Sequence, residues 1–269
     1  MRIATSGGSA LAFLFVFAFA AAAQEVIPLQ TRPGVTETYF LASAPKNPQA
    51  IAILFPGGGG WIKIRTENGQ PKFEGGNFLV RVRADFVKRG IVAAIVDAPS
   101  DQQRGDGMGD DFRLGADHFT DISAVIADVK KRFPEKPAFL IGTSRGTVSA
   151  AALGARFGDQ VGGVVLTSTL FRRAGSSASK QGLSRFDFAT VKVPLLFVHH
   201  VSDACEFTPY ADAQRQADKY PLISVVGGQT PKSGPCDPFA QHGFYGKESE
   251  TVDEMVNWML KKPYKDVVK

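Results

Sequence analysis

The sequence has few of the residues that mark metal-binding, disulfide-rich or nucleic-acid-binding proteins. Its 269 residues include only two cysteines and four histidines, and no His-x-x-x-His or Cys-x-x-Cys pair occurs. It therefore predicts no metal site and no cofactor. The formal charge is +5, but the 31 lysines and arginines are scattered without a dense basic run, which argues against a nucleic-acid partner.

Long hydrophobic runs are also missing after the first 23 residues. Within them, Arg2 supplies a positive start, residues 10–20 are almost entirely Ala, Phe, Leu and Val, and residues 21–23 are alanine. A short apolar run that ends in small residues is typical of a secretory signal peptide, whereas a membrane span needs about 20 apolar residues. We therefore expect cleavage after Ala23, a periplasmic or secreted protein, and no membrane contact after cleavage.

The rest of the chain alternates short β-rich apolar runs with helical patterns, which is typical of parallel strands joined by crossover helices. With 44% hydrophobic and 21% charged residues, residues 24–269 are expected to form a single domain. The pattern predicts strands at 50–55, 91–96, 138–141, 163–166, 194–199 and 222–226, and helices at 77–89, 117–133, 148–157 and 249–260. Residues 100–115 are expected to be a polar loop. Residues 171–190 are polar and aperiodic, so they are the only candidate for a small lid or substrate loop.

The most informative motif is the pentapeptide Gly142-Thr143-Ser144-Arg145-Gly146. In a chain with 28 glycines a Gly-x-Ser-x-Gly match arises by chance with a probability on the order of a tenth, so its context matters more than the match. An apolar strand enters it and an Ala-rich helix leaves it, and the glycines allow a sharp turn that exposes the Ser144 hydroxyl. A hydroxyl is a poor nucleophile at neutral pH, so Ser144 needs a base and a group that orients the base.

This arrangement resembles the α/β-hydrolase superfamily, and within it the compact dienelactone-hydrolase-like serine esterases, over most of the chain after residue 23. The resemblance implies an α/β-hydrolase fold with a mostly parallel central sheet, helices on both faces and little or no lid. It also implies the chain order nucleophile, acid, base. Asp203 follows the strand expected at 194–199 and takes the place of the acid. His242 lies past the last expected strand and takes the place of the base.

Other residues of the same types compete for these two roles. Glu206 and Asp237 are carboxylates near the same two loops, although a loop carboxylate is more often merely solvated. His118, His199 and His200 precede the last strand, and we expect them to be structural or to face the substrate. The assigned base is the only histidine after that strand.

A glycine-rich turn, Gly57 to Gly60, follows the first expected strand. In the family such a turn supplies backbone N–H groups that help bind the oxyanion of the tetrahedral intermediate. The resemblance places one donor at Gly58 or Gly59 and the other at Arg145, the residue after the nucleophile. Pro56 stands where the family often has His, so the choice between the two glycines stays open.

The two cysteines lie in the part of the chain that we expect to be exported, where oxidation is permitted. Cys205 is two residues after Asp203, and Cys236 is six before His242. A disulfide would therefore tie the acid loop to the histidine loop, and our hypothesis is that it holds acid and base in register. Two free buried thiols are the alternative.

The sequence thus predicts an exported serine hydrolase that forms an acyl-enzyme on Ser144, with His242 as base and Asp203 as the group that orients it. The expected partner is a small-molecule ester or a related acyl compound, with amides, lactones and acetylated sugars left open, as is the oligomeric state. A non-catalytic binding protein on the same fold and an acyltransferase with the same three residues are the alternatives.

Overall fold

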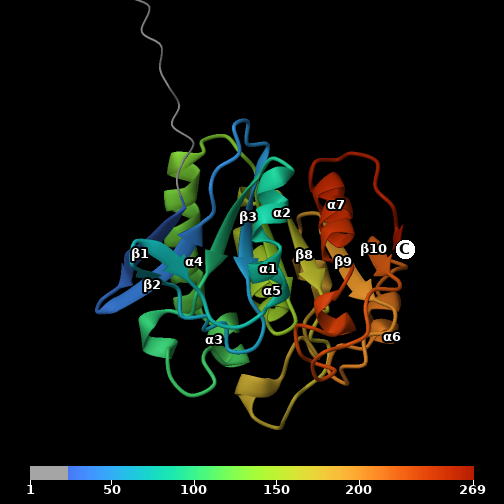
Figure 1. The fold of residues 1–269 in the computed structure, drawn as a ribbon. Coiled ribbons are helices and arrows are strands. Elements are labelled where there is room, and N and C mark those ends of the chain that lie inside the picture. Colours follow the sequence, from blue (N-terminus) through green and yellow to red (C-terminus); the bar gives the residue numbers. More distant parts are fainter. Residues whose placement is uncertain (1–23) are drawn as a thin grey trace, which may run out of the picture.

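A central nine-stranded sheet organises the computed structural model, which describes residues 24–269 (Figure 1). The signal-peptide prediction for residues 1–23 lies outside the described residues. The strand order is β1-β2-β6-β3-β7-β8-β9-β10-β11. Their bounds are β1 Glu25–Arg32, β2 Val35–Leu41, β3 Ala50–Phe55, β6 Ile91–Val96, β7 Ala138–Thr143, β8 Gly163–Thr167, β9 Leu195–His200, β10 Leu222–Val225 and β11 Val267–Val268.

Most neighbouring strands of this sheet are parallel. Only β2 pairs antiparallel with its two neighbours, β1 and β6. The six expected strands are all present, each within two residues of its expected ends. The prediction of a mostly parallel sheet is therefore confirmed. A separate antiparallel pair, β4 (Arg65–Glu67) and β5 (Gln70–Lys72), lies between β3 and the first helix.

Helices cover both faces of the sheet, as predicted (Figure 1). Alternate residues of β3 point to opposite faces, so Ile51 and Ile53 belong to one apolar cluster and Ala52 and Leu54 to the other. The first cluster includes α4 and α5, and the second includes α1, α2 and α7. The helix bounds are α1 Phe78–Arg81, α2 Arg83–Lys88, α3 Asp110–Leu114, α4 Ala116–Arg132, α5 Gly146–Phe157, α6 Tyr210–Gln214 and α7 Glu248–Met259.

The sequence prediction was wrong in two helical regions. The single helix expected over 77–89 is two short helices, because the buried Val82 leaves helical geometry at φ −89° and ψ 4°. The loop expected over 100–115 contains α3. This helix has no apolar periodicity to reveal it, because it buries the charged side chains of Asp110 and Arg113.

The lid candidate at 171–190 does not line the cavity in front of Ser144. It packs on the first apolar cluster through Leu183 and Phe188, which are buried. The backbone N–H of Gly182 also donates to Asp110 Oδ2 at 2.7 Å. These contacts tie the segment to the body of the fold, which agrees with the prediction of little or no lid.

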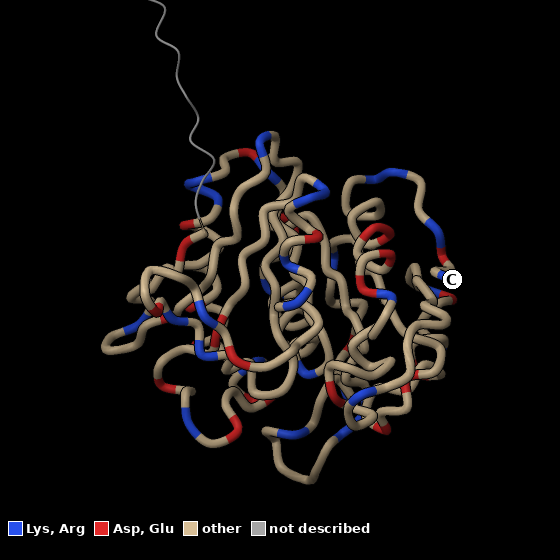
Figure 2. The backbone as a smooth tube through the Cα atoms, in the orientation of Figure 1, with Lys and Arg blue, Asp and Glu red and all other residues tan. Residues whose placement is uncertain are grey.

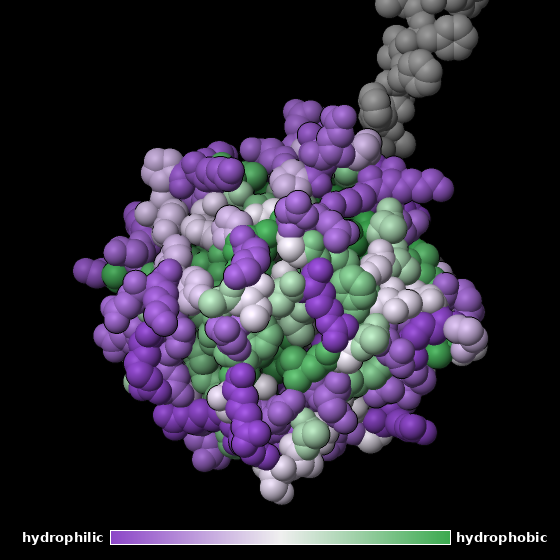
Figure 3. Space-filling model, turned by 180° about the vertical axis from the view of Figure 1, so that it is seen from behind, coloured by the Kyte–Doolittle hydropathy of each residue, from purple (hydrophilic) through white to green (hydrophobic). Residues whose placement is uncertain are grey.

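The surface of the described part has mixed character. Lys and Arg are spread along the tube among acidic and neutral residues (Figure 2). Seen from behind, hydrophobic residues gather near the middle of the face and hydrophilic residues around it (Figure 3). Within residues 24–269, no helix combines the length and the apolar character needed to cross a membrane.

Candidate active site

Ser144 sits in the sharp turn between β7 and α5. Its φ of 52° lies in the left-handed region, which is strained for a residue other than glycine. Its N–H donates to Thr167 O at 2.9 Å, and the Thr147 hydroxyl donates to Ser144 O at 2.6 Å. Backbone contacts therefore hold this residue in the geometry of a nucleophile elbow.

Asp203 and His242 come together although 39 residues separate them in the chain. Asp203 follows β9, and His242 lies in a short 3₁₀ turn, Gln241–Gly243. The distance from His242 Nδ1 to Asp203 Oδ2 is 3.0 Å, and both side chains are buried. The carboxylate can accept a hydrogen bond from Nδ1–H of His242. This contact keeps the proton on Nδ1 and leaves Nε2 free to act as a base.

Thr208 contacts both residues of this pair, a role that the sequence did not predict. Its hydroxyl donates to Asp203 Oδ2 at 2.9 Å and lies 3.1 Å from His242 Nδ1. The other carboxylate oxygen, Oδ1, accepts the backbone N–H of Cys205 at 3.0 Å. Both oxygens of Asp203 are therefore held in place. A threonine five residues after an acid has no sequence signature of this role.

The competing carboxylates have no such partners. Glu206 is exposed. Asp237 is also exposed, and its Oδ2 accepts the backbone N–H of Gly234 at 3.0 Å. Neither carboxylate forms a hydrogen bond or ion pair with His242 in the part of the chain that the structure describes.

The three competing histidines are buried, and none of them lines the cavity at Ser144. Burial lowers the pKa of His118 to about 3 and that of His199 to about 4, so both are neutral at neutral pH. His199 Nε2 accepts the backbone N–H of Thr169 at 2.6 Å, and His200 Nε2 lies 2.9 Å from Gly227 O. For His199 and His200 these contacts agree with the structural one of the two expected roles.

The glycine-rich turn lies directly beside the nucleophile. A Cβ added to Gly57 would lie 3.0 Å from Ser144 Cβ, and Gly58 has a φ of +59° that favours glycine. Within residues 24–269, the backbone N–H groups of Gly58, Gly59 and Arg145 donate to no acceptor. All the candidate donors that the sequence proposed, Arg145 and one of Gly58 and Gly59, therefore have N–H groups without an acceptor in this part of the chain.

A cavity of about 580 Å³ opens in front of Ser144. His242 and the whole Gly57–Gly60 turn line it, together with Asn77, so Ser144, His242 and the two candidate glycines border one space. Its remaining lining residues are Trp61, Ile62, Lys63, Glu74, Gly75, Gly76, Phe78, Gly105, Thr143, Cys236, Asp237, Pro238 and Gly243.

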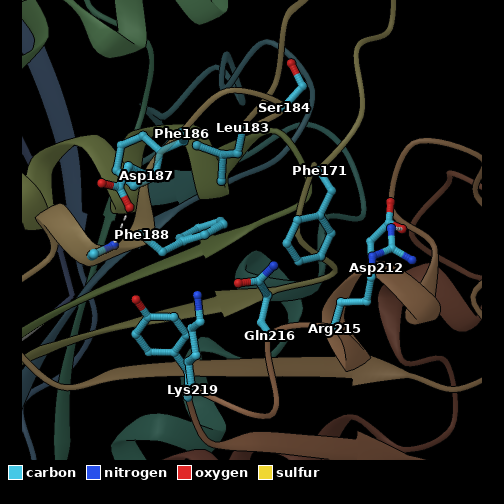
Figure 4. Close-up of a pocket in the computed structure, with 12 residues that line it drawn as sticks. Phe171, Leu183, Ser184, Phe186, Asp187, Phe188, Asp212, Arg215, Gln216 and Lys219 are labelled. Atoms are coloured by element: carbon cyan, nitrogen blue, oxygen red, sulfur yellow. Dashed lines mark hydrogen bonds and ion pairs between the residues drawn. The ribbon is translucent and has the colours of Figure 1, made fainter.

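A second cavity, of about 350 Å³, lies between the 171–190 segment and the region around α6 (Figure 4). The rings of Phe171 and Phe188 and the side chains of Arg215 and Lys219 are among the groups that line it. It shares no lining residue with the cavity at Ser144. The proposed chemistry makes no use of this second cavity.

A disulfide joins Cys205 and Cys236, which are 31 residues apart. It connects the loop that carries Asp203 to the segment that leads to His242. The loop-entropy model assigns a closure of this length about 3 to 4 kcal/mol.

We expect the Cys205→Ser, Cys236→Ser double variant to lose roughly that free energy of unfolding. Its kcat should also fall, because acid and base are then held by weaker contacts. Denaturant titration and ester kinetics measure both effects. A reducing agent should destabilise the wild-type protein and leave the double variant unchanged. Two free thiols in the purified protein, detected by non-reducing mass spectrometry, would contradict the pairing.

Comparison with known proteins places the chain in a family. A family model described as serine aminopeptidase, S33, matches residues 76–229, more than half of the sequence. The chain belongs to this family. It is thus a serine hydrolase of the α/β-hydrolase superfamily, as the sequence predicted. None of the curated protein sequences compared with the chain matches it.

Solved structures share this fold at low sequence identity. Est1E from Butyrivibrio proteoclasticus is 17% identical, with 89% of this chain and 98% of that chain covered and a TM-score of 0.57. XC6422 from Xanthomonas campestris, described as an α/β serine hydrolase without a lid, is 13% identical, with coverages of 86% and 94% and a TM-score of 0.56. A cold-adapted esterase from an Arctic intertidal metagenomic library is 17% identical, with coverages of 89% and 93% and a TM-score of 0.54.

Proposed function

We propose that the protein is an exported ester hydrolase that acts through an acyl-enzyme on Ser144. The observation that carries this proposal is the buried contact between His242 Nδ1 and Asp203 Oδ2, 3.0 Å long, beside a cavity that His242 and Ser144 both line. The cold-adapted esterase among the structural relatives supports ester bonds as the target. The Cys205–Cys236 disulfide is compatible with export.

In the first half of the reaction, Ser144 Oγ attacks the ester carbonyl carbon while His242 Nε2 takes the hydroxyl proton. Asp203 orients the imidazole and stabilises its protonated form. The carbonyl oxygen becomes an oxyanion, which the N–H of Arg145 and that of Gly58 or Gly59 stabilise. The tetrahedral intermediate then collapses, His242 gives the proton to the leaving alcohol, and the acyl group stays on Ser144. In the second half of the reaction, water attacks the acyl carbon while His242 takes a proton from it. The intermediate then collapses, the acid leaves, and His242 returns the proton to Ser144 Oγ.

The cavity favours compact acyl groups. Glycine supplies eight of the lining positions, and the 171–190 segment, which packs elsewhere, adds no apolar cover. Long acyl chains need an extended apolar surface to leave water. Short-chain esters are therefore the proposed substrates.

Labelling with a fluorophosphonate probe tests this proposal. The probe should add to Ser144, as located by peptide mass spectrometry, and Ser144→Ala protein of intact fold should take none. The labelled polypeptide should come from the exported fraction and lack residues 1–23. Absence of labelling in folded wild-type protein would reject the enzyme and favour a binding protein.

A substrate panel then separates the enzyme classes. Short-chain nitrophenyl esters should turn over faster than long-chain esters and aminoacyl anilides. Product formation that depends on an added alcohol acceptor would identify an acyltransferase instead.

A further inference from the structure

The proposed mechanism makes no use of one buried positive charge, the guanidinium of Arg113 in α3. Only 1% of Arg113 is exposed. Burial and the nearby charge of Arg145 lower its pKa to about 9, which keeps it protonated at neutral pH. Within residues 24–269 it forms no ion pair, because the neighbouring Asp110 pairs with Arg145 at 2.6 Å. A buried cation without a counter-ion is costly, so its other contacts indicate its role.

Those contacts join the glycine-rich turn to α5. Arg113 Nη2 donates to Gly58 O at 3.1 Å, and Nη1 donates to the Ser149 hydroxyl at 2.7 Å. A Cβ on Gly60 would lie 2.8 Å from Nη2, so the turn packs directly on the guanidinium. Arg113 therefore links the Gly57–Gly60 turn to the helix that begins beside Ser144.

The segment that leads into α3 supports the same turn from the same side. Met108 N–H donates to Gly59 O at 2.9 Å. A Cβ on Gly59 would lie 1.8 Å from Asp106 O, so only glycine allows this approach. The carbonyl groups of Gly58 and Gly59 thus both accept hydrogen bonds, from Arg113 and Met108, whereas within residues 24–269 their N–H groups donate to no acceptor.

We infer that Arg113 is a positioning residue for the oxyanion hole, and this inference rests on the proposed function. It holds the glycine-rich turn in place and polarises the Gly58–Gly59 peptide. A carbonyl that accepts a charge-assisted hydrogen bond makes the N–H of the same peptide unit a stronger donor. That N–H belongs to Gly59, which is therefore the donor from the turn. The buried positive charge also favours the oxyanion over the neutral ester.

The variant Arg113→Met tests this role through the split between kcat and KM. The polarised donor acts on a charge that develops in the transition state, so kcat should fall about 10- to 100-fold while KM changes little. Rates are expressed per site titrated with fluorophosphonate, which removes the effect of misfolded protein. The affinity for a boronate transition-state analogue should fall by a similar factor. Arg113→Lys keeps the charge and should recover part of the loss.

Arg156→Met is the matched control. Arg156 donates to Leu114 O and Gly115 O at the end of α3 and does not contact the turn, so its loss should leave kcat per titrated site unchanged. Wild-type kcat in Arg113→Met, or equal weakening of ester and boronate binding, would overturn the inference. If Arg113→Met does not fold, the uncharged Arg113→Gln takes its place, and a wild-type kcat in that variant overturns the inference. Absence of labelling in the wild-type protein would overturn the proposed function as well.

Discussion

The variant Asp203→Asn is expected to lose about 10⁴-fold in kcat for ester hydrolysis at neutral pH. Asp203 Oδ1 accepts a hydrogen bond from the N–H of Cys205. Oδ2 accepts hydrogen bonds from the Thr208 hydroxyl and from His242 Nδ1. The asparagine amide has only one acceptor oxygen, and that oxygen accepts the hydrogen bond from the Cys205 N–H. The amide NH₂ then faces Nδ1 and favours the tautomer with its proton on Nε2. In that tautomer His242 cannot take the proton of the nucleophile.

Steady-state kinetics of the folded variant measure this loss, and circular dichroism verifies the fold. Glu206→Gln is the matched control, because Glu206 is an exposed carboxylate three residues along the same loop. It should retain the wild-type kcat. If Asp203→Asn lost less than about tenfold, or if Glu206→Gln lost as much, Asp203 would not be the orienting acid.

Gly146→Ala is expected to prevent the native fold. The added Cβ would lie 2.0 Å from Phe55 O and 2.8 Å from Pro56 O, both backbone atoms. No side-chain rotation relieves such a contact, so β3 and α5 would have to move apart where the glycine-rich turn begins. We expect a loss of more than about 4 kcal/mol in the free energy of unfolding, which is a large effect for one substitution. Soluble yield and thermal unfolding measure it.

Gly175→Ala provides the matched control for this steric effect. Gly175 is exposed, and a Cβ there would meet only the flexible side chain of Lys180, at 3.0 Å from Cδ. Its stability should stay close to that of the wild-type protein. Native stability in Gly146→Ala would contradict the close approach of α5 to the end of β3.

Local patterns in the sequence predicted the parts of the fold that are buried on both sides. Strands such as β3 and β6 are continuous apolar runs, because helices cover both faces of a parallel sheet. The hairpin of β1 and β2 escaped prediction. It lies at the edge of the sheet, where β1 mixes exposed and half-buried residues with Pro28 and shows no clean alternation.

The site shows the same division. The sharp turn at Ser144 could be predicted because strand, glycines and helix are neighbours in the chain, so the turn is a local structure. Thr208 and Arg113 could not. Each acts on a residue that it meets only after folding, and nothing in its own neighbourhood marks the contact.

The amino-acid sequence alone predicts a mostly parallel α/β fold, a nucleophile at Ser144, and a short list of acids and histidines. Only the tertiary structure shows which of these acids contacts which histidine. It pairs His242 with Asp203 and leaves Glu206 exposed on the surface, because burial and loop packing, not spacing, decide which carboxylate reaches the imidazole. It also places a buried arginine behind the glycine-rich turn, 55 residues from its contact at Gly58. Periodicity reports only on neighbours in the chain, so contacts of this range appear only in the tertiary structure.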